Sequence, residues 1–330
     1  MKLTAYFGEN ARVEGRLVSD ALLDYLERSG VATAVLLRGV EGFGHSHRLH
    51  TEHFPDTAPK LPLVAVAVDE RERIAPLVAG AAKLVSGGLV TLERASLGTG
   101  AAELPVEAKL TVYLARHQRV DGRPAHRALV ELLRGHELAA ATVLLGVDGL
   151  LAGRRQRARF LGRNGETPLV ATAVGPGATV AALLPEIARR FAEPAMAVER
   201  VQVCKREGDL LAVPEQLPPG TLQKLTIHAG AHARAGAHPL PLALVRGLRE
   251  ADSAGATMLR SVWGYAGGEA PHGDRVALVR QTPSLVVTID RPEEIQRLWP
   301  LIDALTGEAG LVTSERVPGL SFAEPGTNPL

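Results

Sequence analysis

The chain has 330 residues, of which 46% are hydrophobic and 22% charged, and its formal net charge is +1. This near-neutral balance gives no electrostatic indication of nucleic-acid binding. The single cysteine, Cys204, excludes an internal disulfide and is typical of a reducing compartment. The first residues lack the apolar core of a secretion signal, and the longest apolar run, residues 61–68, is too short to span a bilayer. We therefore expect a cytoplasmic protein without membrane insertion.

The sequence contains three related segments. The tripeptide Lys-Leu-Thr occurs at residues 2–4, 109–111 and 224–226, and each time an apolar run follows that ends at a glycine, namely Gly42, Gly149 and Gly264. Each segment has a typical domain size and is large enough to bury a core. The sequence therefore predicts three repeats at residues 1–98, 109–205 and 224–318, linkers at 99–108 and 206–223, and a tail at 319–330.

The first repeat shows the expected order of elements. Hydrophobic spacing predicts a strand, a helix, two strands, a helix and a strand, over residues 3–7, 17–28, 33–40, 61–68, from 69 onward, and 89–97. Asp69 followed by Glu72 matches a capping box at the start of the second helix. A proline falls inside each second-helix region, at Pro76, Pro185 and Pro300, where we expect a kink or a delayed start. The order β-α-β-β-α-β is the ferredoxin-like split arrangement, so the predicted fold class is α+β with three tandem ferredoxin-like domains.

The third strand of each repeat indicates how the repeats are arranged. Residues 61–68 are apolar on both faces, which is typical of strands that are buried on both sides. A four-stranded sheet with helices on one face leaves its other face bare, and the nearest cover is the other two repeats. We therefore expect an intramolecular pseudo-trimer with the sheets facing inward, and a monomer in solution.

Residues around the first glycine-rich run resemble a known family. Repeat 1 carries Leu36-Leu37-Arg38-Gly39-Val40-Glu41-Gly42-Phe43-Gly44, then Arg48-Leu49-His50, then Leu61-Pro62-Leu63-Val64. This is similar to the PII-like family called domain of unknown function 190, and the resemblance extends over all three repeats. Repeat 3 keeps Arg260 and Gly264 but lacks the Arg-x-His, and repeat 2 has Leu145 in place of the arginine.

The resemblance implies a trimeric ferredoxin-like assembly like that of the nitrogen-regulatory PII signalling proteins. In those proteins adenine nucleotides bind between neighbouring subunits, and a long loop between strands two and three contacts target proteins. The corresponding loops here are residues 43–60, 150–167 and 265–282. The implied function is a ligand-sensing regulatory protein that binds a small anionic metabolite or nucleotide in interdomain clefts and signals to a protein target through loop 43–60.

The resemblance and the chemistry of its residue types give one set of ligand-binding residues. Glycine lets a backbone approach a ligand closely, and arginine suits a phosphate or carboxylate. The other interpretation is a strand exit built from glycine with a salt-bridged arginine. Because repeat 2 has lost the arginine, we expect one or two working clefts. The expected ligand-binding residues are Arg38, Gly39, Gly42, Phe43, Gly44, Arg48, His50, Arg260 and Gly264.

Two polar loops suggest alternatives. Four histidines within residues 45–53 could hold a transition metal, so the alternative function is a metal-binding or ion-tolerance protein of the same fold. The preferred interpretation of this segment is a polar loop without metal. We assign no metal ligand and no cofactor. The arginines of loop 150–167 could bind an acidic partner or nucleic acid, but we expect a solvated surface. The residues concerned are His45, His47, His50 and His53, and Arg154, Arg155, Arg157, Arg159 and Arg163.

The remaining chemical groups have structural interpretations. Trp263 and Tyr265 either stack on a ligand base or pack at the end of a strand, and Cys204 is expected to be buried. The sequence has no Walker loop, no Gly-x-Ser-x-Gly and no His-Glu-x-x-His motif. We therefore expect no enzymatic activity. An enzyme with dispersed catalytic residues is a third hypothesis, and it would need a cleft holding a perturbed acid–base pair.

Overall fold

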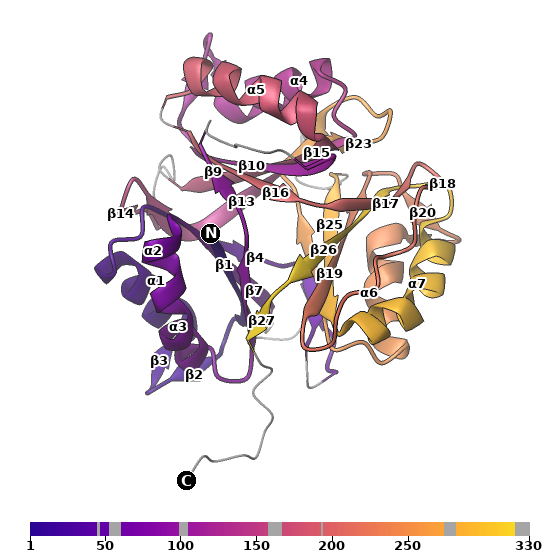
Figure 1. Ribbon diagram of the computed structural model, residues 1–330, viewed down its shortest axis with the longest axis horizontal. Helices are drawn as coiled ribbons and strands as arrows, with labels where there is room; N and C mark the ends of the chain where they lie inside the picture. Colours follow the sequence, from indigo (N-terminus) through magenta and orange to yellow (C-terminus); the bar gives the residue numbers. More distant parts are fainter. Residues whose placement is uncertain are drawn as a thin grey trace.

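A computed structural model describes residues 1–44, 47–52, 61–98, 105–157, 167–192, 194–273 and 282–320. The fold is α+β with mostly antiparallel sheets, and the same order of elements occurs three times, as the sequence predicted. Figure 1 shows the helices in three groups on the outside of the molecule and the strands toward its middle.

The repeats have closely matching elements. Repeat 1 contains β1 (Lys2–Gly8), α1 (Val18–Arg28), β4 (Thr33–Arg38), β7 (Pro62–Val68), α2 (Arg71–Ile74), η1 (Ala75–Leu77), α3 (Val78–Leu84) and β8 (Leu89–Glu93). Repeat 2 contains β10 (Glu107–Ala115), α4 (Ala125–Gly135), β13 (Ala140–Leu151), β15 (Pro168–Pro176), α5 (Gly177–Arg190) and β16 (Ala195–Arg200). Repeat 3 contains β19 (Leu222–Ala229), α6 (Leu240–Glu250), β22 (Ala256–Arg260), β25 (Ser284–Asp290), α7 (Pro292–Thr306) and β26 (Leu311–Val317).

Each repeat places its strands in the order fourth, first, third, second. The sheets are β8-β1-β7-β4, β16-β10-β15-β13 and β26-β19-β25-β22. A two-stranded hairpin precedes each first helix. The hairpins are β2 (Arg12–Val13) with β3 (Arg16–Leu17), β11 (Arg119–Val120) with β12 (Arg123–Pro124), and β20 (Arg234–Ala235) with β21 (His238–Pro239).

Helical spacing explains how each repeat builds a core of its own. In α1 the residues Val18, Leu22 and Leu26 lie on one face, and all three are buried against the sheet. Pro76 lies in the 3₁₀ turn that separates α2 from α3, whereas α5 and α7 continue through Pro185 and Pro300. The expected interruption therefore occurs in repeat 1 only, because a proline can be accommodated when neighbouring contacts hold the helix.

The other face of each sheet points toward the middle of the molecule. One buried apolar cluster there combines residues of all three repeats, including Val64, Val170 and Leu285 at the same position of the third strands. Apolar residues on this face of each repeat thus pack against residues of the other two, as is typical of strands that are apolar on both sides.

A short segment after each second strand pairs with the second strand of another repeat, and we call these segments the junction strands. Gly42 lies opposite Thr257, Gly149 opposite Val35, and Gly264 opposite Thr142. Repeat 1 thereby extends repeat 3, repeat 2 extends repeat 1, and repeat 3 extends repeat 2. The junction strands are β5 (Glu41–Phe43), the C-terminal part of β13, and β23 (Trp263–Ala266).

The opposite edge of each sheet closes in the same cyclic way. Segments that follow the fourth strand of one repeat pair with the fourth strand of the next. Two of them start within the last residues of expected repeats 1 and 2, and the third starts at the first residue of the expected tail. β10 and β19 begin two residues inside the expected linkers. The pairing segments are β9 (Ser96–Leu97) on β16, β17 (Gln202–Arg206) on β26, and β27 (Gly319–Leu320) on β8. In the described parts of the chain, every four-stranded sheet is therefore extended at both edges.

Candidate ligand site at the junctions between repeats

The junction glycines are positions where backbone approaches backbone. A Cβ atom on Gly42 would lie 2.5 Å from the Ala256 carbonyl oxygen, and Cβ atoms on Gly149 and Gly264 would meet the equivalent carbonyls of repeats 1 and 2. Real Cβ atoms do not approach that closely, so a side chain at Gly42 would push the two strands apart. These glycines serve the pairing between repeats. A ligand role for Gly42 and Gly264 stays a prediction.

The residue after each junction glycine inserts into the core of another repeat. Phe43, Leu150 and Tyr265 have exposed fractions of 5%, 0% and 1%, and they lie in the cores of repeats 3, 1 and 2, respectively. Burial of such side chains stabilises each contact by roughly 1.5–3 kcal/mol. Phe43, expected at a ligand site, is thus part of the core of repeat 3.

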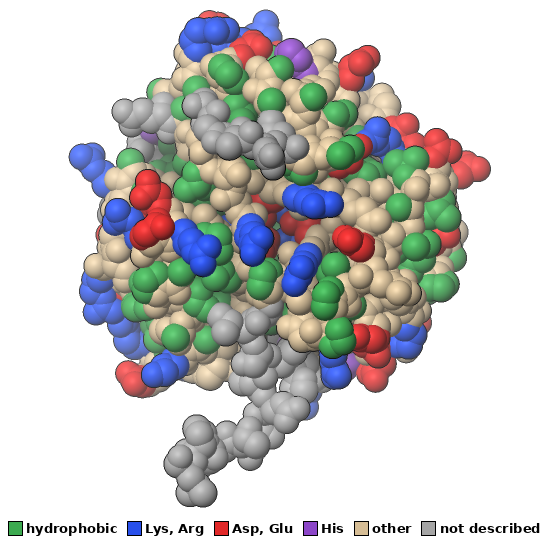
Figure 2. Space-filling view, in the orientation of Figure 1, with side chains coloured by type: hydrophobic (Ala, Val, Ile, Leu, Met, Phe, Trp, Pro, Cys, Tyr) green, Lys and Arg blue, Asp and Glu red, His purple; other side chains and the backbone are tan. Residues whose placement is uncertain are grey.

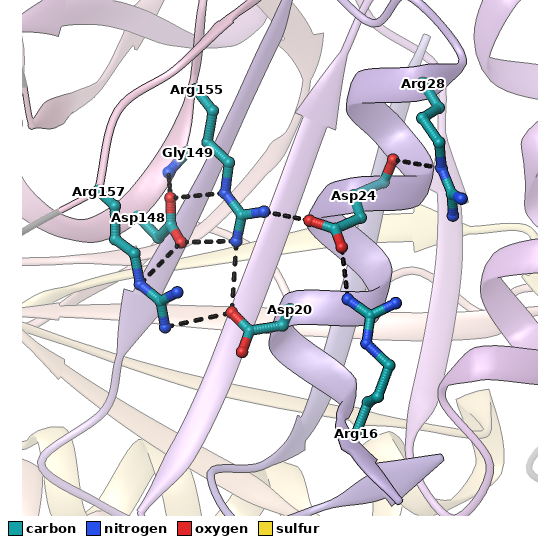
Figure 3. A network of polar contacts seen from close by, with 8 residues as sticks. All are labelled: Arg16, Asp20, Asp24, Arg28, Asp148, Gly149, Arg155 and Arg157. Carbon is teal, nitrogen blue, oxygen red and sulfur yellow. Dashed lines mark hydrogen bonds and ion pairs between the residues drawn. The ribbon is translucent and has the colours of Figure 1, made fainter. Parts of the chain in front are cut away.

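Beyond this shared framework, the three junctions carry different chemistry. Between repeats 1 and 2, Arg155 contacts Asp148 of its own repeat at 2.9 Å, and Asp20 and Asp24 of α1 (Figure 3). Arg157 adds ion pairs to Asp20 at 3.2 Å and to Asp148 at 3.6 Å. Figure 3 shows the Arg155 guanidinium between Asp148 and Asp24, and the Arg157 guanidinium in contact with Asp148 and Asp20, so charged side chains connect the two repeats at this junction.

These contacts also bear on the basic loop of repeat 2. Arg155, in β14 (Arg154–Arg155), and Arg157 bind acidic residues of repeat 1, whereas Arg154 is exposed. Hydrogen bonding from Arg16, together with Arg155, outweighs desolvation and lowers the pKa of Asp24. Arg159 and Arg163 lie outside the described residues.

The junction between repeats 2 and 3 is aromatic. Arg127 of α4 lies 4.2 Å from the ring centroid of Trp263, a cation–π contact, and Tyr265 donates a hydrogen bond to the Leu138 carbonyl at 2.9 Å. Both rings are buried, with exposed fractions of 9% and 1%. The structure therefore favours packing at the end of a strand over stacking on a ligand for this pair.

The junction between repeats 3 and 1 brings most of the expected ligand residues together. β5 and β6 (His50–Thr51) form a hairpin whose strand β5 lies on β22, the strand that ends at Arg260. The Val40 N–H donates to the Met258 carbonyl, and the Glu52 N–H donates to the Val40 carbonyl. Gly264 lies apart, at the junction between repeats 2 and 3. The expected residues that this hairpin and its base bring together are Arg38, Gly39, Gly42, Phe43, Gly44, Arg48 and His50.

Two arginines of this junction, Arg38 and Arg260, are held by carboxylates. Arg38 donates two hydrogen bonds to Glu9, at 2.8 and 3.0 Å, while the Arg260 guanidinium pairs with Glu52 across the two repeats. The side chain of Arg260 is 15% exposed and that of Glu52 is 24% exposed. Arg48 is exposed, and nothing lies within 4 Å of a Cβ atom built on Gly44. The Arg260–Glu52 pair thus ties repeat 3 to the base of loop 43–60.

The histidines expected as an alternative metal site are only partly described. His47 lies 3.6 Å from Asp252 of repeat 3, and its ring is 5.8 Å from that of Phe43. His50 is half-buried in β6. His45 and His53 lie outside the described residues, so the metal hypothesis stays a prediction.

The most highly charged part of the interior lies outside the site residues predicted from the sequence. Three lysines and three glutamates alternate in a closed ring where the inward faces of the three sheets meet, and we call it the axial ring. Each ammonium lies between two carboxylates, at Nζ–Oε distances of 2.5 to 3.3 Å. In order around the ring, its members are Lys2, Glu199, Lys109, Glu315, Lys224 and Glu93.

Within this ring, desolvation and the neighbouring charges shift the pKa values of the side chains in opposite directions. Desolvation opposes ionisation of Glu93 and Glu315, but the neighbouring ammonium groups outweigh it and lower the pKa of both carboxyls. For Lys109, desolvation is the larger effect and lowers its pKa. The glutamate oxygens lie within 4.8 Å of one another, close enough for a cation, but the three ammonium groups already supply the positive charge.

Next to the ring, the same strand position carries Tyr6, Tyr113 and His228. His228 is 1% exposed, and neither of its ring nitrogens has a hydrogen-bond partner among the residues that the structure describes. Desolvation, with the nearby charge of Lys109, lowers the pKa of His228 to about 4, so the ring is neutral at pH 7. The repeated tripeptide Lys-Leu-Thr was the signal in the sequence that could have indicated the axial ring. Alternation along a strand puts Lys and Thr on one face and Leu on the other.

Family membership agrees with this repeated structure. Within the described ranges, no helix combines the length and the apolar character needed to cross a membrane. The family model described as "DUF190: Uncharacterized ACR, COG1993" matches three times, over residues 1–97, 107–203 and 222–319. These matches cover nearly the whole chain, and the resemblance found in the sequence is confirmed. The protein therefore belongs to the family of domain of unknown function 190, of which it carries three tandem copies.

Proposed function

We propose that this protein is a single-chain, PII-like sensor that binds a small anionic metabolite or nucleotide at the junction between repeats 3 and 1. Its three ferredoxin-like repeats act as an intramolecular pseudo-trimer, and it works in the cytoplasm. The observation that carries the proposal is the ion pair between Arg260 of repeat 3 and Glu52 of repeat 1. The guanidinium that would bind the ligand also holds the base of loop 43–60.

The ion pair gives ligand binding a way to act on the loop. An anionic ligand competes with Glu52 for the fork of Arg260, because a guanidinium binds a phosphate or carboxylate through two parallel hydrogen bonds. Glu52 follows β6 directly, and its N–H donates to Val40 at 3.0 Å. Release of the Glu52 side chain weakens that attachment, and the changed loop signals to a protein target.

Differences between the junctions support one working site. At the position of Arg260, repeat 1 has Arg38, which is paired with Glu9 of its own repeat, and repeat 2 has Leu145. The junction between repeats 1 and 2 is filled by the contacts of Arg155, and that between repeats 2 and 3 by Trp263. Among the described residues, the junction between repeats 3 and 1 is where an arginine that bridges two repeats contacts loop 43–60, the expected signalling loop.

Isothermal titration with ATP, ADP, cyclic nucleotides and 2-oxoglutarate tests this proposal. Arg260→Gln should weaken binding of the best ligand about tenfold, which is the loss of one charge-assisted contact. Glu52→Gln should tighten binding, because it removes the competing carboxylate. Arg297→Gln breaks an exposed pair with Glu294 inside repeat 3 and serves as the matched control, with affinity unchanged.

The rate of hydrogen exchange at the Glu52 amide measures directly whether the attachment of the loop changes. Saturating ligand should speed exchange at this amide in the wild-type protein, and Glu52→Gln should show the faster exchange without ligand. The proposal is wrong if none of the ligands binds. It is also wrong if a ligand binds with the same affinity to the wild-type, Arg260→Gln and Glu52→Gln proteins.

A further inference from the structure

A second place for an anion lies in the middle of the molecule, away from the junction of repeats 3 and 1. A cavity of about 1320 Å³ opens over the axial ring and is lined by all three repeats. Figure 2 shows basic side chains around the centre of this face, with acidic side chains visible between them. The ring glutamates Glu93, Glu199 and Glu315 form part of the cavity wall.

The basic side chains of the cavity occupy equivalent positions. Arg94, Arg200 and Arg316 each follow a ring glutamate in the sequence, and each is exposed at the cavity. Among the residues that the structure describes, none of these three guanidinium groups has an ion-pair or hydrogen-bond partner. They contrast with Arg38, Arg155 and Arg260, which are all held by carboxylates.

The charges around the cavity sum to a positive value. The axial ring is neutral, because its three ammonium groups match its three carboxylates. Glu107 at the cavity wall has Arg206 at 3.8 Å, and only Glu215 among the remaining carboxylates opposes the three arginines. A positive, concave surface with guanidinium forks from three sides suits an anion with several oxyanion groups.

The floor of the cavity contains side-chain oxygens that can accept hydrogen bonds. Gln223 is fully buried, its Nε2 donates to Ser314 at 2.8 Å, and its Oε1 has no partner. Among the described residues, Glu315 Oε1 is likewise buried without a hydrogen-bond partner. Buried acceptors without partners call for a donor, so a ligand that reaches the floor should carry a hydroxyl group.

We propose that this cavity binds one hydroxylated polycarboxylate per chain, with its carboxylates on Arg94, Arg200 and Arg316 and its hydroxyl toward Gln223 and the ring glutamates. The site goes beyond the function proposed above and does not depend on it. Its signal in the sequence is the dipeptide Glu-Arg, which occurs at the end of all three fourth strands.

Titration calorimetry with citrate at low salt tests the site, with tricarballylate, which lacks only the hydroxyl, as the matched ligand. Citrate should bind with one site per chain and more tightly than tricarballylate. The triple variant Arg94→Gln, Arg200→Gln, Arg316→Gln should lose at least a hundredfold in affinity, since each arginine contributes about fivefold or more.

The chain offers a control with the same change in net charge. Arg12, Arg119 and Arg234 occupy equivalent places in the three hairpins, where each donates to a carbonyl of its own turn. Replacing these three by Gln should leave citrate affinity within about twofold, and so should Arg260→Gln. The proposal is overturned if the wild-type protein does not bind citrate, if tricarballylate binds equally well, or if the control triple variant loses as much affinity as the axial one.

Discussion

Gly42 and Gly44 are two residues apart, yet an added side chain would meet different surroundings at each. Gly42→Ala should destabilise the protein by roughly 1–3 kcal/mol, because its Cβ would press on the backbone of Ala256 in repeat 3. Gly44→Ala should change the stability by no more than about 0.5 kcal/mol, because nothing lies within 4 Å of its Cβ position. Urea denaturation of both variants measures the difference, and equal stability would mean that the strands are not in close contact at Gly42.

The sequence showed that a glycine recurs at the position of Gly42 in each repeat, but it did not show which contact requires that glycine. Glycine permits close approach by a ligand or by another backbone. The strand that approaches Gly42 comes from repeat 3, more than two hundred residues away in the chain. Neither hydrophobic spacing nor the motif identifies that partner, so the structural reason for the glycine could not be predicted from the sequence.

His228 gives the stability of the protein a dependence on pH. Its pKa of about 4 in the folded state lies below the value of 6.5 for an unperturbed histidine, so the unfolded state binds the proton more readily. Stability therefore falls as pH falls from 6.5 toward 4, by about 2 kcal/mol between pH 7 and pH 5 from this group.

His228→Tyr, which introduces the residue found at the equivalent positions Tyr6 and Tyr113, should remove that part of the pH dependence. Chemical denaturation at pH 7 and pH 5 compares the two proteins. His232→Tyr, at a histidine whose side chain is 65% exposed, should keep the wild-type difference. If His228→Tyr kept the full difference as well, the buried histidine would not be its source.

Among the elements, the junction strands connect the sequence of one repeat to the stability of another. Leu150 of β13 is fully buried in the core of repeat 1, although it belongs to repeat 2. Leu150→Ala should therefore destabilise the protein by roughly 2–5 kcal/mol, as expected for a large cavity in a core. Leu210→Ala, at a leucine that is 53% exposed, should have an effect below about 0.5 kcal/mol.

Thermal unfolding followed by hydrogen exchange locates the effect of Leu150→Ala. Amides of α1 in repeat 1 should lose protection, since that helix packs over the same core. Loss of protection confined to repeat 2 would contradict the contact between repeats.

The order of elements within one repeat could be predicted because it depends on local spacing. Val18, Leu22 and Leu26 mark the buried face of α1, and the apolar residues of 61–68 mark a strand buried on both sides. The short pairing segments β9, β17 and β27 could not be predicted, because two to five residues carry too little pattern and their partners belong to other repeats. The interruption at Pro76 was predicted, whereas the unbroken course of α5 and α7 was not.

On the scale of the whole molecule, fusion of three repeats lets equivalent positions diverge. The axial ring keeps the same Lys and Glu in every repeat, since each ammonium serves carboxylates of two repeats. The junctions have diverged into an Asp–Arg network, an aromatic contact and the Arg260–Glu52 pair. The sequence indicated this difference through Leu145, but the partners of each arginine came from the arrangement of the repeats.

We infer that one chain closes the ring of three repeats by itself. In the described ranges, both edges of every four-stranded sheet pair with segments of the same chain, so these edges are not available to a second copy. Light scattering over a range of protein concentrations measures the molar mass in solution. We predict a constant mass of 34.9 kDa, that of one chain. A stable mass of two or three chains would contradict closure within a single chain.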